Sequence, residues 1–256
     1  MPVCLIAWWN NIPVVLHESD SVVGRASSCI ARMATIVCSG FPDVAWPTSI
    51  RKKVTLTGNP IRASIFSGSE AAGQRITGFS GKRPVLLVIG GSQGSEALNQ
   101  AVSKSQTELI ALADLIHLSG VGKKTAASHA RYFVRPTVDE ELPHLYALAG
   151  IVLSRSGAGI LSELAALKKT VITVPLAGVA QDHQVRNADV LARKNSVIYL
   201  KQTDLDSLPQ VVSDLLKTPD RSRTLGETLH TFFPNDAAKK IARLTLAEAK
   251  KHPLES

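Results

Sequence analysis

Short, uninterrupted apolar runs alternate with helical patterns along most of the chain. From Pro84 onward the runs PVLLVIG, ADLIHLSG, GIVLS, TVITVP and SVIYL are each followed by a loop or a helical pattern, and a shorter run surrounds Tyr132. Strands that are apolar on both faces are buried on both faces, which is typical of a parallel sheet covered by helices. The sequence therefore predicts an α/β, doubly wound fold with ligands at the carboxyl ends of its strands.

Three earlier runs, IPVVL (12–16), ATIVCS and VTLTG, predict a second, smaller unit. Gly58-Asn59-Pro60 and the polar, small-residue stretch after it indicate a boundary between the two. We expect residues 1–60 to be part of an N-terminal unit and residues 61–82 to be a linker. Residues 83–256 would form a complete unit of six strands, whose connections include a helix near 123–130. The last helix would pack back toward the N-terminal part.

The apolar N-terminal stretch MPVCLIAWWNNIPVVL is broken by Asn10, Asn11 and Pro13, and no basic residue precedes it. It is too interrupted for a membrane-spanning helix and lacks the layout of a signal peptide. The pattern predicts the end of a helix, a turn and a buried strand. A chain that starts in mid-helix leads us to expect that an upstream part of the fold is absent.

The balance of charge is basic, with 29 Lys and Arg against 21 Asp and Glu and a formal net charge of +8. Such a balance favours an anionic partner: nucleic acid, an acidic membrane surface or a phosphorylated substrate. The charges are scattered and no aromatic residues are interleaved with them, so nucleic acid is not an expected partner. A basic face that docks on anionic lipid fits the pattern at least as well.

A glycine-rich loop, Gly90-Gly91-Ser92-Gln93-Gly94, joins a predicted buried strand to a helix. Glycines there let the backbone approach a ligand, and the helix N-terminus offers free N–H groups to a phosphate. A tight turn without a ligand is the alternative. No Gly-Lys-Ser/Thr follows, so the loop is not a Walker A motif, and the acid that binds a dinucleotide ribose is missing after ADLIHLSG.

A second loop, Arg155-Ser156-Gly157-Ala158-Gly159, repeats this strand-to-helix pattern. Ile160 begins the apolar stripe of the helix, and Glu163 lies one turn beyond Gly159, off that stripe. A carboxylate there can accept hydrogen bonds from the two vicinal hydroxyls of a ribose. The alternative is that Glu163 only complements the helix dipole.

A third loop follows the strand TVITVP and carries Gln181, Asp182, His183, Gln184 and Asn187. Amide and imidazole groups at a strand's carboxyl end suit a polyhydroxylated ligand such as a sugar. Asp182 could equally cap the following helix.

The pair His17-Glu18 ends the first predicted strand, either as polar site residues or as a core histidine beside a surface acid. No cluster has metal-ligand spacing and no nucleophile elbow is present, so neither a metal nor a cofactor is expected.

The ordered set IPVVLHESD, TGNPIR, GGSQG, RSGA…SE and DHQ…NA resembles the MurG family, glycosyltransferase family 28, from about Ile12 to Ala242. The resemblance implies a GT-B fold of two doubly wound domains. It implies an inverting, metal-independent hexosyltransferase that moves GlcNAc from UDP-GlcNAc to the lipid-linked muramyl-pentapeptide (lipid I), in peptidoglycan synthesis and thus cell-wall growth and division. Its place would be the cytoplasmic face of the bacterial plasma membrane, held peripherally.

Carried over residue by residue, the resemblance gives each loop a role. The GGSQG loop would contact the diphosphate through Ser92. Gln184 and His183 would face the GlcNAc, and Glu163 would bind the ribose hydroxyls. Val138 or Asp139 would meet the uracil. The implied donor-binding residues are Arg62, Gly91, Ser92, Gln93, Val138, Arg155, Ser156, Gly157, Ala158, Gly159, Ile160, Glu163, His183 and Gln184.

On the acceptor side the resemblance implies His17, Glu18 and Asp20, with His17 and Glu18 as catalytic candidates, and it places Trp8 in an apolar membrane-facing patch. The family's GGTGGH loop, which carries the histidine usually proposed as general base, does not occur in this chain. We therefore expect impaired turnover. The alternatives are a non-catalytic donor-binding subunit of a two-chain glycosyltransferase, or another GT-B enzyme such as a UDP-GlcNAc 2-epimerase.

Overall fold

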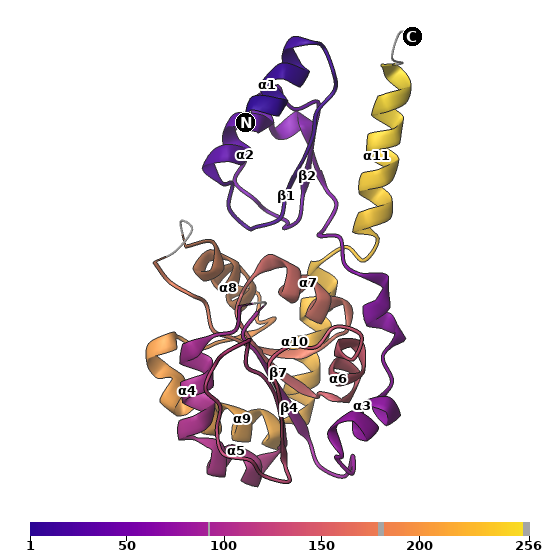
Figure 1. Ribbon diagram of the computed structural model, residues 1–256. Helices are drawn as coiled ribbons and strands as arrows, with labels where there is room; N and C mark the ends of the chain where they lie inside the picture. Colours follow the sequence, from indigo (N-terminus) through magenta and orange to yellow (C-terminus); the bar gives the residue numbers. More distant parts are fainter. Residues whose placement is uncertain (92, 179–181, 253–256) are drawn as a thin grey trace.

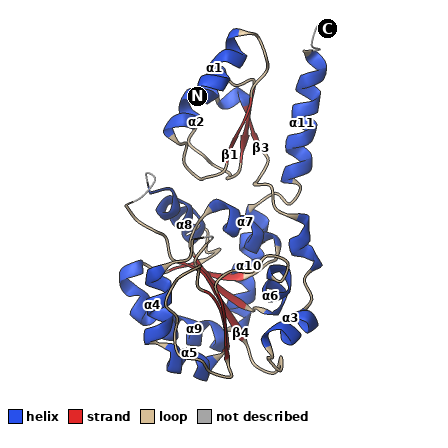
Figure 2. Cartoon of the chain, viewed as in Figure 1, coloured by secondary structure: helices blue, strands red, loops and turns tan. Residues whose placement is uncertain are grey.

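Two parallel sheets organise the chain. The computed structural model describes residues 1–91, 93–178 and 182–252. The two sheets lie in separate parts of the chain (Figures 1 and 2). A three-stranded sheet has the order β1-β2-β3, and a six-stranded sheet has the order β6-β5-β4-β7-β8-β9. The strands are β1 (Val15–Glu18), β2 (Ile36–Ser39), β3 (Val54–Leu56), β4 (Val85–Ile89), β5 (Asp114–Leu118), β6 (Tyr132–Arg135), β7 (Ile151–Ser154), β8 (Thr170–Thr173) and β9 (Ile198–Tyr199).

Helices connect consecutive strands, except between β5 and β6, and they cover both faces of the larger sheet (Figure 2). The helices before β4 are α1 (Pro2–Trp9), α2 (Arg25–Met33), η1 (Arg51–Lys53), η2 (Ala63–Ser67) and α3 (Glu70–Thr77). Those from β4 onward are α4 (Glu96–Lys104), α5 (Gln106–Leu112), α6 (Leu142–Leu148), α7 (Ala158–Ala166), α8 (His183–Arg193), η4 (Gln202–Ser207), α9 (Leu208–Lys217), α10 (Pro219–Phe232) and α11 (Ala237–Lys251). The predicted α/β fold class is confirmed, and a strand forms at each predicted apolar run, although the first begins later than predicted.

The order of the larger sheet reverses between β4 and β7. The chain builds outward from β4 through β5 to β6, and then returns to add β7, β8 and β9 on the other side of β4. Loops that leave β4 and β7 at their carboxyl ends therefore diverge and leave a crevice between them. The glycine-rich loop at Gly90–Gly94 and the loop at Arg155–Gly159 are these two loops, so the topology brings them together.

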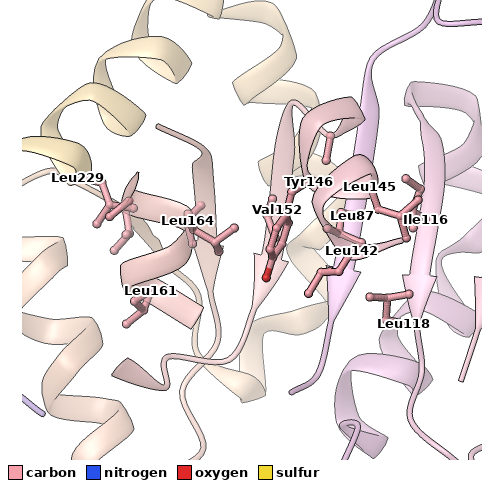
Figure 3. Packing of buried hydrophobic residues seen from close by; sticks show 14 of the residues in the cluster. Leu87, Ile116, Leu118, Leu142, Leu145, Tyr146, Val152, Leu161, Leu164 and Leu229 are labelled. Atoms are coloured by element: carbon pink, nitrogen blue, oxygen red, sulfur yellow. The ribbon is translucent and has the colours of Figure 1, made fainter. Parts of the chain in front are cut away.

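The core lies on both faces of the larger sheet. On one face Leu87, Ile116 and Val152 of the sheet pack against side chains of α6, α7 and α10, including Tyr146 and Leu164 (Figure 3). On the other face, β-strand residues pack against α4, α5 and α9. Burial of continuous apolar strands on both sides is the physical reason that this sheet is parallel and doubly covered.

The smaller sheet has a modest core of its own, formed by Ala31, Ala34, Val37, Trp46 and Ile50. By contrast, α1 has no buried residue and exposes most of its apolar side chains. Among the described residues, no helix combines the length and the apolar character needed to cross a membrane. The N-terminal helix is therefore an exposed apolar surface of the small unit.

Two asparagine side chains join the small unit to the large one. Asn187 of α8 is fully buried; its Oδ1 accepts from the Ser21 N–H at 2.8 Å, and its Nδ2 donates to Asp20 Oδ1 at 2.8 Å and to the Ser156 carbonyl at 3.1 Å. Asn59 donates to the Ser19 carbonyl and to Ser162 Oγ, both at 3.0 Å. The loop after β1 is thereby tied to the loop after β7 through Asn187 and Ser156, and to α7 through Asn59 and Ser162.

The segment predicted as a linker, residues 61–82, contains η2 and α3 and packs on the larger unit. The Ser69 N–H donates to His144 Nδ1 at 3.1 Å, and a Cβ on Gly73 would meet the His144 carbonyl at 2.6 Å. At the other end, α11 runs beside the smaller sheet, where Lys240 Nζ donates to the Leu56 carbonyl (Figure 1). Both connections between the units are therefore held by specific contacts.

Two local predictions were wrong. No helix forms near 123–130: Gly120 and Gly122 adopt positive φ values of 89° and 69°, and the Ala127 carbonyl accepts from Gln106 Nε2 instead of from a helical neighbour. So short a segment has little helical stability of its own. The first strand begins at Val15 and not at Ile12, because the Ile12 N–H still bonds back to the Ala7 carbonyl of α1.

A buried polar network lies under α4. His117 is fully buried, with Nε2 2.9 Å from Asn99 Oδ1 and Nδ1 2.8 Å from the Tyr132 hydroxyl. Because Asn99 Nδ2 donates to the Ser119 carbonyl, its oxygen accepts, which assigns the proton of a neutral imidazole to Nε2. Burial lowers the pKa of His117 from 6.5 to about 4. The network thus favours neutral His117 in the folded state.

This pKa shift predicts acid lability. The contribution of His117 to stability is complete above pH 6.5 and is lost as the pH falls toward 4, by about 3 kcal/mol in all. Urea unfolding of the parent and of His117→Gln at pH 7 and pH 4.5 checks it. The variant is expected to be less stable at pH 7 and to lose less stability on acidification; parallel pH dependences would contradict the assignment.

Candidate functional site

Two adjacent cavities open at the carboxyl edge of the larger sheet. The larger, about 640 Å³, is lined by Gly90, Gly91, Gln93, Gly94, Ser95, Glu96, Ala97, Gln100, Arg155, Gly157, Ile160, Leu176, Gln184 and Gln202. The smaller, about 360 Å³, is lined by Arg62, Ile89, Gly91, Leu118, Pro136, Thr137, Val138, Leu142, Tyr146, Gly159, Ile160 and Glu163. Gly91 and Ile160 line both, so the two cavities lie side by side between the loops after β4 and β7.

The larger cavity faces the N-terminus of α4. Ser95 caps this helix by accepting from the Leu98 N–H, and other first-turn N–H groups have no partner within the helix. Gly94 has a φ of 70°, and a Cβ there would meet the Ser119 carbonyl at 2.3 Å. The loop therefore needs glycine to turn this closely past β5. A helix N-terminus at the end of such a turn attracts an anion such as a phosphate.

Arg155 fastens the floor of the larger cavity. Its guanidinium donates to Ser95 Oγ from Nε at 3.1 Å and from Nη2 at 2.7 Å, to the Val174 and Pro175 carbonyls, and to Gln202 Oε1 at 2.8 Å. The side chain is buried. The structure thus connects the predicted donor residue Arg155 to the cap of α4 and the end of β8, and its donors are engaged by protein atoms.

The smaller cavity combines apolar walls with one carboxylate. Ile89, Leu118, Leu142, Val138 and Ile160 contribute aliphatic surface, which suits a flat heterocyclic ring. Glu163 enters from the side on α7, one turn beyond Gly159, with its side chain 15% exposed. This pairing of an apolar slot with a single acceptor group resembles a nucleoside pocket.

Glu163 is held on both oxygens. Its Oε1 lies 3.2 Å from Nε and from Nη2 of Arg62, and its Oε2 accepts from the Tyr146 hydroxyl at 3.2 Å. Arg62 also approaches the exposed Asp139 at 3.4 Å. The alternative role for Glu163, complementing the helix dipole alone, does not account for these partners, since both come from outside α7.

The two candidates for the uracil contact differ in position. Val138 lines the smaller cavity and is partly buried, whereas the Asp139 carboxylate is 90% exposed and turned toward Arg62. The structure therefore favours Val138 as the wall residue.

Polar groups of α8 reach the other end of the larger cavity. Gln184 lines it and accepts from the Leu176 N–H through Oε1 at 3.1 Å. His183 Nδ1 lies 3.1 Å from Asp20 Oδ2, an ion-pair distance without an aligned hydrogen bond. These contacts place Asp20 of the small unit beside the N-terminus of α8, next to the end of the larger cavity that Gln184 lines.

The two acid–base candidates of the small unit both have structural partners. His17 Nε2 bonds with the Gly58 carbonyl at 3.1 Å. Glu18 is buried and accepts from the Asp20 and Gly24 N–H groups. These contacts fix the loop that faces α8, and a catalytic role for either residue stays a prediction.

The remaining predicted donor residues divide by burial. Gly91, Gln93, Gly157, Gly159 and Ile160 line the cavities. Ser156 and Ala158 are buried beneath them and shape the loop rather than its surface. Ser92 and Gln181 lie outside the described residues.

Two residues of the third loop differ from expectation. Asn187 is fully buried in the joint between the units and does not face a sugar site. Asp182 occupies the N-cap position of α8 at a φ of 57°, but its carboxylate accepts from the Gly178 N–H and makes no cap bond. A residue at positive φ turns its side chain away from the geometry that caps a helix.

Sequence reasoning missed three residues of the site: Ser95, Gln202 and Tyr146. Tyr146 has apolar neighbours at helical spacing in LPHLYAL, so the sequence indicates a core residue. Its hydroxyl is the one feature in the sequence that could have pointed to a polar partner. Ser95 and Gln202 are polar residues at helix starts, a pattern shared by many non-functional caps. Within the described residues, no group of three His, Cys, Asp or Glu could hold a metal ion.

The cavities lie in a region with known relatives. The profile described as "Glycosyltransferase family 28 C-terminal domain" matches residues 85–241. A Clostridium kluyveri protein named UDP-N-acetylglucosamine--N-acetylmuramyl-(pentapeptide) pyrophosphoryl-undecaprenol N-acetylglucosamine transferase is 36% identical over 249 residues, covering 95% of this chain and 69% of that protein. The chain thus spans about two thirds of that relative's length.

Solved structures share the fold. MurG from Acinetobacter baumannii matches with a TM-score of 0.72 at 22% identity, covering 96% of this chain and 70% of that one. A UDP-N-acetylglucosamine 2-epimerase matches with a TM-score of 0.61 at 14% identity, covering 99% of this chain and 70% of that one. Identities this low speak for the fold alone, and that fold is GT-B.

The contacts of Arg155 predict a large cost for a conservative change. Arg155→Lys removes most of its hydrogen bonds and leaves buried acceptors unpaired, which is expected to lower the free energy of unfolding by about 2–4 kcal/mol. Arg223→Lys, in an exposed pair with Asp220, is the matched control and should cost less than about 1 kcal/mol. Urea denaturation measures both, and equal effects would contradict this role.

Proposed function

This chain is a member of glycosyltransferase family 28, and we propose that it transfers GlcNAc from UDP-GlcNAc to the lipid-linked muramyl-pentapeptide. The observation that carries the proposal is the pair of adjacent cavities at the switch point, one facing a helix N-terminus and the other an apolar slot beside Glu163. This is the arrangement that a nucleoside diphosphate needs. Peptidoglycan synthesis, and through it cell shape and division, is the proposed process.

The proposed donor would lie along the two cavities, with its uridine in the smaller one. Uridine would occupy the smaller cavity, with the ring against Val138 and the ribose hydroxyls at Glu163. The diphosphate would pass Gly91 to the N-terminus of α4, and GlcNAc would extend toward Gln184 in the larger cavity. Arg62 lies at the mouth of the nucleoside cavity and can reach the donor from there.

Transfer is a direct displacement at the anomeric carbon. The 4-hydroxyl oxygen of the muramyl sugar forms the new bond, the bond from the anomeric carbon to the phosphate oxygen breaks, and UDP leaves with the electron pair. Negative charge grows on the departing diphosphate, where the N–H groups and dipole of α4 can stabilise it. The hydroxyl proton goes to a base, for which His17 and Glu18 are the proposed candidates in this chain.

A non-catalytic, donor-binding subunit is the second candidate function. It is favoured by the difference between the two units: the six-stranded sheet carries both cavities, whereas the other sheet has three strands. UDP-GlcNAc binding without GlcNAc transfer to lipid I would indicate this function. Epimerisation of UDP-GlcNAc without an acceptor would indicate the third, a 2-epimerase.

Donor binding is expected to depend on Glu163. Glu163→Gln keeps the side-chain shape and removes the charge, so it should weaken UDP-GlcNAc binding about 10- to 100-fold in calorimetric titration, the range of a hydrogen bond to a charged group. Glu227→Gln, an exposed carboxylate on α10, is the control and should bind like the parent. Absence of UDP-GlcNAc binding by the parent would refute the proposed donor.

We also propose peripheral attachment to an anionic membrane through α1. Trp8 is 54% exposed and Trp9 is 81% exposed, while the exposed basic residues Arg32, Arg51 and Lys52 lie on the same small unit. Aromatic rings insert at the lipid interface and nearby basic groups attract anionic headgroups. The cytoplasmic face of the bacterial plasma membrane is the proposed location, and lipid I is the proposed acceptor there.

Co-sedimentation with vesicles tests this attachment. Vesicles containing phosphatidylglycerol should bind the protein, less so at high salt, and replacing both Trp8 and Trp9 with Ser should reduce binding about tenfold or more because two rings no longer insert. Val121→Ser, an equally exposed apolar position on the large unit, should leave binding unchanged. Salt-insensitive binding, or equal loss in both variants, would argue against α1.

A further inference from the structure

Tyr146 is a core residue with one polar atom at the edge of the nucleoside cavity. It sits on α6, is 1% exposed and packs with Leu142, Leu145 and Val152 (Figure 3). Its hydroxyl donates to Glu163 Oε2 at 3.2 Å. A phenylalanine would fill the same space, so packing alone does not account for the hydroxyl. The polar contact that the hydroxyl makes is the hydrogen bond to the Glu163 carboxylate.

The two partners of Glu163, Arg62 and Tyr146, differ in how firmly they can hold the orientation of its carboxylate. The Arg62 side chain is 52% exposed and binds Oε1 from the solvent side. Exposed ion pairs contribute little, because water and salt compete and both side chains lose entropy. Tyr146 is 1% exposed and packs in the core beside the smaller cavity, and a hydrogen bond to a charged oxygen is strong. Tyr146 is therefore the more constrained of the two partners of Glu163.

The surroundings of Tyr146 keep its hydroxyl protonated, so that it acts as the donor in the hydrogen bond to Glu163. Burial raises the pKa of its phenol, and the neighbouring Glu163 carboxylate raises it further. The hydroxyl stays protonated at every working pH and gives its hydrogen to Oε2. One acceptor position of Glu163 Oε2 is thus occupied by the Tyr146 hydroxyl. The other acceptor positions of the carboxylate remain for hydroxyl groups in the cavity.

We propose that Tyr146 is a positioning residue for sugar recognition: by fixing Glu163 it makes the site select a ribonucleotide over a 2′-deoxyribonucleotide. The proposal rests on the uridine diphosphate site of the proposed function. A 2′-deoxy ligand leaves one acceptor of a fixed, largely buried carboxylate without a partner, and a fixed carboxylate cannot turn to recover it. A carboxylate free to rotate would discriminate less.

Calorimetric titration with UDP and with 2′-deoxy-UDP tests this inference. The parent should bind UDP about 10- to 100-fold more tightly than 2′-deoxy-UDP, as expected for a hydrogen bond to a charged group. Tyr146→Phe should reduce this ratio about fivefold, the effect of one hydrogen bond, by weakening UDP and leaving 2′-deoxy-UDP unchanged. A merely structural role of the hydroxyl would weaken both ligands alike.

Tyr132→Phe is the matched control. Tyr132 is a second buried tyrosine of the same unit whose hydroxyl bonds to His117, away from both cavities. Its loss should lower the unfolding temperature to a similar extent and leave the UDP to 2′-deoxy-UDP ratio unchanged. The pair of variants therefore separates general stability from ligand selectivity.

Glu163→Gln provides a second, independent variant. If Tyr146 acts through Glu163, the ratio should be low in Glu163→Gln, and adding Tyr146→Phe should not lower it further. An unchanged ratio in either single variant overturns the inference, as does equal weakening of both ligands by Tyr146→Phe. Failure of the parent to bind UDP removes the proposed function itself, whereas binding without 2′-hydroxyl selectivity removes only this inference.

Discussion

The buried amide of Asn187 is the interaction on which the arrangement of the two units depends. It joins the loop after β1 to the loop after β7 through both its oxygen and its nitrogen, and Asn59 adds a second pair of bonds beside it. An amide can donate and accept at once, and the Asn187 side chain does both, so it pairs with groups of both units. The position of Asp20 and Glu18 opposite α8 follows from this joint.

The candidate site is built by topology and then tightened by side chains. Reversal of strand order between β4 and β7 opens the crevice, and Arg155 ties the β7 loop to the cap of α4 across it. Tyr146 does the same for the smaller cavity by reaching from α6 to α7. In both places a buried donor holds a group of a neighbouring element, so the ligand surfaces are formed before any ligand arrives.

Local sequence signals were reliable where one physical cause dominated. Apolar runs gave the strands, because burial on both faces demands them, and glycines marked the two loops where the chain turns closely. The prediction of a helix near 123–130 was wrong because its Ala and Lys content is compatible with a helix, but turns at Gly120 and Gly122 and a side-chain contact from α5 decided otherwise. Asn187 looked like a sugar ligand for a similar reason: its polarity was visible and its burial was not.

The sequence by itself determined the parallel α/β architecture, the three strand-end loops and the residue types that they carry, since these follow from hydrophobic periodicity and glycine geometry along the chain. Only the tertiary structure decided which of those residues face a cavity. It turned Asn187 inward, engaged Arg155 with protein acceptors, and brought Tyr146 to Glu163 from a different helix. The physical reason is that hydrogen-bond partners distant in sequence are chosen by packing, and packing is a property of the whole fold.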